Sequence, residues 1–105
     1  MNFKDMGKMM KQVQKMQEDL AKMQDNLKDM TVEATSGGGV VKVVATGKQE
    51  IKLIKINPEA IDPEDVEMLE DLVLSAVNEA LRKSQELQSE QMSQITGGIK
   101  VPGLF

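Results

Sequence analysis

The sequence of 105 residues predicts an α+β fold: a long N-terminal helix, a three-stranded antiparallel meander and a long C-terminal helix. Three observations predict it. Apolar residues recur at helical spacing through the first thirty positions, Val and Ile dominate residues 31–56, and a helix-start signal opens a second helical pattern at residues 62–96. The length allows one domain, which we place at residues 1–98, followed by a short C-terminal tail at residues 99–105.

The first helix is predicted from Asp5 to about Met30. Its apolar residues lie alternately three and four positions apart, which is the heptad pattern of a helix that buries one stripe. Methionine at this spacing more often fills the gaps of a packing seam than it forms a ligand groove or a membrane-binding face. We therefore predict a packing and dimer seam made of Met9, Val13, Met16, Leu20, Met23 and Leu27.

The middle of the chain is predicted to form three short strands, at about residues 31–36, 40–46 and 49–56, joined by tight turns. The glycine run at residues 37–39 resembles a phosphate-binding loop only superficially. It precedes a strand and lacks the Gly-Lys-Ser/Thr ending of a P-loop, so we interpret it as a hairpin loop.

The second helix is predicted to start at Asp62, as an N-cap, with Pro63 in the first helical position, and to run to about Thr96. The first helix enters the sheet at its C-terminal end, and the second leaves the sheet at its N-terminal end. Both free ends, residues 1–15 and 82–96, are therefore expected to project from the sheet. Because one small sheet cannot cover both helices, the seam must be buried by the second helix, by a partner subunit, or by both. A homodimer with projecting helices is the simplest solution.

The charges are unevenly distributed along the chain, whose net charge is −4. Residues 57–81 hold eight acids and no base, whereas the first helix carries a lysine row opposite its seam. Such a row is either a face that keeps the protein soluble or a set of phosphate contacts. Lysine binds phosphate as a point charge, so DNA binding would be salt-sensitive and weakly selective in sequence. The candidate DNA-contacting residues are Lys4, Lys8, Lys11, Lys15, Lys22, Arg82, Lys83 and Lys100.

Several classes of function are disfavoured. The chain contains neither cysteine nor histidine, which removes the commonest catalytic base and the commonest transition-metal ligands, and the acids of residues 64–71 lack the spacing of a calcium loop. Only Phe3 and Phe105 are aromatic, so stacking of single-stranded bases is not expected. We predict a cytoplasmic protein that is not an enzyme, with no cofactor, no metal ion, no small-molecule substrate and no membrane partner.

Four stretches resemble the YbaB/EbfC family of bacterial nucleoid-associated proteins, and together they cover nearly the whole chain. They are MGKMMKQVQKMQEDLAKMQ, VEATSGGGVVKVVATG, INPEAIDPEDVEMLEDLVLSAVNEAL and the ending GGIKVPGLF. The resemblance implies a small cytoplasmic homodimer in which paired sheets form a body and the helices protrude like tweezers around duplex DNA. It does not imply a particular sequence preference, because members of the family differ in selectivity.

A second hypothesis is a protein-interaction adaptor that does not bind DNA physiologically. It would grip another protein through the methionine seam or through the tail, where Leu104 and Phe105 are apolar residues able to anchor in a groove. The alternative for the tail is that it folds back on its own dimer.

Overall fold

The computed structural model describes residues 3–96 and, within them, the side chains of residues 5–95. Helix α1 (Phe3–Asp29) is followed by strands β1 (Thr31–Ser36), β2 (Val41–Thr46) and β3 (Ile51–Ile56), and then by helix α2 (Val66–Thr96). Two short 3₁₀ turns, η1 (Gly37–Gly39) and η2 (Pro58–Ala60), lie between these elements. The predicted α+β fold class and the order of its elements are confirmed.

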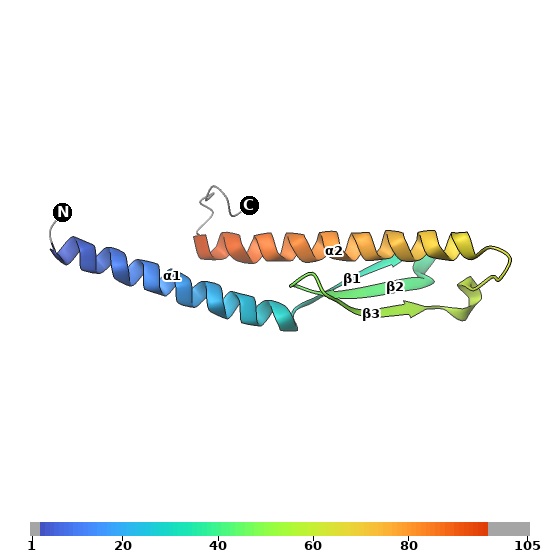
Figure 1. Cartoon of the computed structure of the whole chain (residues 1–105), viewed down its shortest axis with the longest axis horizontal. Helices are drawn as coiled ribbons and strands as arrows, with labels where there is room; N and C mark the ends of the chain where they lie inside the picture. Colours follow the sequence, from blue (N-terminus) through green and yellow to red (C-terminus); the bar gives the residue numbers. More distant parts are fainter. Residues whose placement is uncertain (1–2, 97–105) are drawn as a thin grey trace.

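The molecule is elongated, with extents of 74 × 23 × 16 Å. Figure 1 shows α2 running along most of its length, with the sheet beneath one half of α2 and α1 beside the other half. The two helices run in opposite directions, and both extend away from the sheet. Residues 3–15 project as expected. In α2 the projection begins later than the predicted residue 82, because Lys83 and Ser84 are still hydrogen-bonded to β1 and to the turn after β2.

The sheet is an antiparallel meander in the order β1-β2-β3. Strands β2 and β3 begin one and two residues later than predicted. Val40 adopts a helical conformation after the glycines of η1, so β2 starts only at Val41. Gln49 has a positive φ of 63° in the turn between β2 and β3, which delays the start of β3 to Ile51.

The core lies between α2 and the first two strands. Small side chains on both sides let the helix approach the sheet closely, and larger side chains at the edges of the contact are partly buried. The buried members are Ala34, Val41, Val43, Ala45, Ala76 and Ala80. Because α2 covers β1 and β2, strand β3 is left at the open edge of the sheet.

The turn between β2 and β3 is bonded to both helices. The backbone N–H of Gly47 donates to the carbonyl oxygens of Leu27 (3.0 Å) and Met30 (2.9 Å) at the end of α1. The hydroxyl of Ser84, which is fully buried in α2, donates to the carbonyl of Thr46 (2.6 Å) and accepts from the N–H of Gln49 (3.0 Å). This turn therefore fixes where α1 leaves the sheet and how it lies against α2.

The predicted start of α2 was wrong by one turn. The carboxylate of Asp62 accepts a hydrogen bond from the N–H of Glu64 (2.9 Å) and forms a local turn instead of capping a helix. Asp65 is the capping residue, since its side chain accepts from the N–H of Met68 (3.2 Å) and the helix begins at Val66.

Candidate nucleic-acid interface

Helix α1 divides into a packed half and a projecting half. In the packed half, Met23 and Leu27 are buried and Leu20 is half-buried. Near the end of α2, Ile95 lines a cavity with Gln12 and Met16 of α1. Residues 3–11 of α1 therefore extend beyond the described part of α2, as Figure 1 shows at the blue end of the chain.

Four of the predicted DNA-contacting lysines form one exposed row along α1, namely Lys8, Lys11, Lys15 and Lys22. Among the described side chains, ion pairs involve Lys28, Lys42 and Arg82, and none of the four lysines of the row. Lys4 lies in α1, but its side chain is outside the described residues, as is the whole of Lys100. The row is therefore a line of unpaired positive charge along α1, with Lys8 and Lys11 beyond α2 and with Lys15 and Lys22 at cavities that α2 also lines.

The predicted seam occupies the opposite face of α1, and only part of it is buried in the single chain. Met23 and Leu27 lie in the interior, whereas Met9, Val13 and Met16 are exposed. The difference follows from length, because α2 and the sheet reach only the C-terminal part of α1.

The two basic residues predicted on α2 are already engaged. The guanidinium of Arg82 donates to the carboxylate of Glu79 (Nε–Oε2, 3.0 Å) and also binds Glu86. The hydrogen bond from Arg82 holds the pKa of the Glu79 carboxyl below its usual value, and the bond to Glu79 raises the pKa of Arg82. The ammonium of Lys83 donates to the backbone carbonyl of Glu33 in β1 (2.8 Å). The positive charge of Arg82 is thus balanced locally, and Lys83 serves to join α2 to the sheet.

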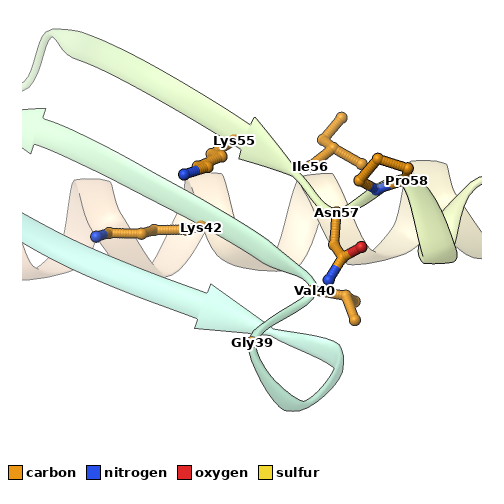
Figure 2. A pocket seen from close by; sticks show the side chains of 7 residues that line it. All are labelled: Gly39, Val40, Lys42, Lys55, Ile56, Asn57 and Pro58. Atoms are coloured by element: carbon orange, nitrogen blue, oxygen red, sulfur yellow. The ribbon is translucent and has the colours of Figure 1, made fainter.

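A second basic feature lies on the sheet, and sequence reasoning did not single it out as a site. Figure 2 shows Lys42 and Lys55 side by side at a cavity of about 420 Å³ whose other wall includes Asn57 and Pro58. The two lysines are direct cross-strand partners, so their charges repel, and Lys42 is paired with Glu33 (3.2 Å). The pair could not be found by counting from the turn at Gly47, because the register of β2 and β3 shifts between Val44 and Ala45. The acidic region of residues 57–81 begins at this cavity. Because its carboxylates would repel phosphate, the cavity is a poorer DNA site than α1.

Two other kinds of site, a membrane-spanning helix and a metal centre, are absent from the described residues. Between residues 3 and 96, neither helix is apolar enough along its length to cross a membrane. Within the same residues, acidic side chains do not gather in a group that could hold a metal ion.

Known proteins resemble the chain over almost its entire length. The model of the YbaB/EbfC DNA-binding family matches residues 1–99. A nucleoid-associated protein of Desulforamulus reducens is 65% identical over 96% of both chains, and one of Moorella thermoacetica is 59% identical over 98% of this chain and 99% of its own. The fold is similar to that of the uncharacterized protein HP0035 from Helicobacter pylori, with a TM-score of 0.75 at 24% identity, covering 92% of this chain and 99% of that chain.

Proposed function

The chain belongs to the YbaB/EbfC DNA-binding family, and we propose that it acts as a homodimer that binds duplex DNA mainly through phosphate contacts. The family is a DNA-binding family and not a family of enzymes. The observation that carries the proposal is the row of exposed, unpaired lysines on the projecting helix α1. Binding to DNA would place the protein in the cytoplasm, associated with the nucleoid.

The lysine row suits the DNA backbone better than it suits base edges. Lys8 and Lys15 are seven residues apart, so their positions are separated by roughly 10 Å along the helix axis. Lysine offers a mobile point charge to phosphate oxygens, and α1 has no arginine for bidentate contacts with guanine. The proposed mode therefore has limited sequence selectivity.

The acidic net charge is compatible with this mode, because the densest group of acids and the lysines of the projecting end of α1 lie at opposite ends of the molecule. Residues 57–81, which hold eight acids, lie around η2 and the start of α2. In residues 3–15, by contrast, Asp5 is the only acid. Repulsion from the acidic end would orient the molecule so that the projecting helices meet DNA first.

The homodimer is supported by the open side of the sheet. By strand register, Ile54 shares a face with the buried Val43, and Ile51 with the buried Ala45, yet Ile51 and Ile54 are 38% and 43% exposed. Leu74 of α2 is 59% exposed. It lies on the helix flank away from β1, because the residues bonded to β1, Leu72 and Lys83, lie on the other flank. A second copy placed here would bury apolar surface from both elements and would bring two lysine rows into one particle.

The proposal is tested by titrating a fluorescent duplex with the purified protein at several salt concentrations, in the presence of an unrelated competitor duplex. We expect binding whose log K falls linearly with log salt, and a sedimentation coefficient of a dimer for the free protein. Absence of binding at low salt would refute the proposed DNA function. It would favour the adaptor hypothesis, to which the exposed Met9, Val13 and Met16 give some support.

A further inference from the structure

An exposed apolar stripe runs along the projecting half of α1. Its side chains are between 45% and 65% exposed, and they continue the buried seam toward the N-terminus without interruption. Apolar side chains gathered into one strip, as opposed to scattered singly, mark a surface that another element covers. We call this surface the N-terminal stripe; it consists of Met6, Met9, Met10, Val13 and Met16.

The N-terminal stripe is distinct from the proposed DNA-binding face. At about 100° per residue, its members lie on the side of α1 opposite Lys8, Lys11 and Lys15. An occupant of the stripe would therefore leave Lys8 and Lys11 accessible.

The end of α2 brings the chain to this stripe. Ile95, in the last described turn, lines one cavity with Gln12, Lys15, Met16 and Asp19 of α1. A neighbouring cavity is lined by Ile95 and Gln94 of α2 together with Met23 of α1. Helix α2 thus ends beside Met16, at the C-terminal end of the stripe, and beside Lys15, at the edge of the lysine row.

The composition and length of the polypeptide that follows Thr96 match the stripe. Gly97 and Gly98 permit a change of chain direction, and the tail, residues 99–105, carries four apolar side chains: Ile99, Val101, Leu104 and Phe105. Val101 precedes Pro102 and is therefore biased toward an extended backbone. Residues 97–105 can span at most roughly 30 Å when extended. The ten positions from Met16 to Met6 extend over only about 15 Å of helix.

We propose that the tail docks along the N-terminal stripe of α1 in the same chain, running from Met16 toward Met6. The tether favours this occupant, because a segment joined by a short linker acts at an effective concentration in the millimolar range. A free partner of equal affinity would have to reach that concentration to displace it. The inference is independent of DNA binding, since it concerns the opposite face of the helix.

The experiment uses the absence of cysteine from the chain. A Lys100→Cys variant of the full-length protein is coupled to a nitroxide, and the methyl signals of the methionines are recorded by NMR in the oxidised and reduced states of the label. We expect Met6, Met9, Met10 and Met16 to lose most of their intensity, while Met68, at the start of α2, keeps its intensity. A Glu59→Cys variant with the same label is the matched control, and it should spare all four stripe methionines.

Two further samples decide the nature of the contact. In a Lys100→Cys variant that also carries Leu104→Ser and Phe105→Ser, the broadening of Met6 and Met9 should fall severalfold, because the apolar anchors are gone. Undiminished broadening would refute apolar docking, and no broadening in the parent variant would refute docking altogether. Spin-labelled protein without isotope is also mixed with isotope-labelled protein without a spin label. Broadening in this mixture would show that the stripe receives the tail of another copy and would overturn the assignment to the same chain.

Discussion

Replacing Lys8, Lys11 and Lys15 by glutamine is expected to weaken DNA binding without unfolding the protein. The three side chains are exposed and make no ion pair with the described residues. Glutamine has nearly the helix propensity of lysine, so the free energy of unfolding should change by less than about 0.5 kcal/mol. The loss should therefore appear in DNA affinity and not in the melting temperature.

The size of the effect follows from counterion release. Each phosphate neutralised on duplex DNA contributes about 0.9 to the slope of log K against log salt. Three lysines in each of two subunits would contribute a slope of roughly −5, and the triple variant should lose that contribution. Over a fourfold change in salt concentration, such a slope corresponds to a change in affinity of about 10³-fold.

Fluorescence anisotropy of a labelled duplex across a salt series measures this slope directly. The matched control is Lys42→Gln, Lys48→Gln and Lys55→Gln, which lowers the net charge by the same three units but alters the sheet. We expect the control to bind with nearly the parent slope. An equal loss in both variants would show that overall charge governs binding, and an unchanged slope in the α1 variant would refute the assignment to the lysine row.

Four other predictions concern stability, assembly and electrostatics. Gly47→Ala should lower the free energy of unfolding by about 1–3 kcal/mol in a urea titration, because a Cβ there would lie 2.6 Å from Leu27 Cδ2 and 2.9 Å from the Leu27 carbonyl oxygen; unchanged stability would contradict this. Ser84→Ala should cost about 1–3 kcal/mol by leaving the Gln49 N–H and the Thr46 carbonyl without their partner, while the exposed Ser89→Ala should cost almost nothing in the same titration. Leu74→Asp should shift the sedimentation coefficient toward that of a monomer, whereas the charge-matched Gln85→Asp should not. If both variants sediment as dimers, the dimer interface does not include Leu74. Arg82→Gln should raise the pKa of Glu79 toward its ordinary value in an NMR titration, because the hydrogen bond that lowers this pKa is lost. In the parent protein the pair stabilises the fold at neutral pH, and this contribution is lost as the pH falls through the lowered pKa of Glu79. The slope of DNA affinity against salt should not change.

The element order was predictable because each segment has a strong local pattern, and the boundaries were not. Asp62 and Asp65 are equally able to cap a helix from their sequence alone. Asp65 takes that role because Asp62 is committed to a local turn between η2 and α2, which depends on the path of the chain around the end of the sheet.

The candidate site was predictable to the same extent. The common face of Lys8, Lys11 and Lys15 follows from helical spacing, and so does the pairing of Arg82 with glutamates three and four residues away. The bond from Lys83 to the Glu33 carbonyl joins residues 50 positions apart, which no local pattern reveals. The seam is covered only from about Leu20 onward, because the sheet and α2 reach only part of the way along α1. This limit also depends on the tertiary structure and not on a local pattern.

The turn at Gly47 fixes the C-terminal end of α1, so a small change in the angle of α1 there moves its N-terminal end a long way. Helix α1 has 27 residues and is therefore about 40 Å long, so a rotation of roughly 10° at its C-terminal end displaces its N-terminal end by about 7 Å. That displacement is larger than the distance of about 3 Å between a lysine nitrogen and a phosphate oxygen that it binds. In the proposed dimer, the hydrogen bonds of Gly47 to Leu27 and Met30 therefore set the distance between the two lysine rows, although these residues lie far from the proposed DNA contacts.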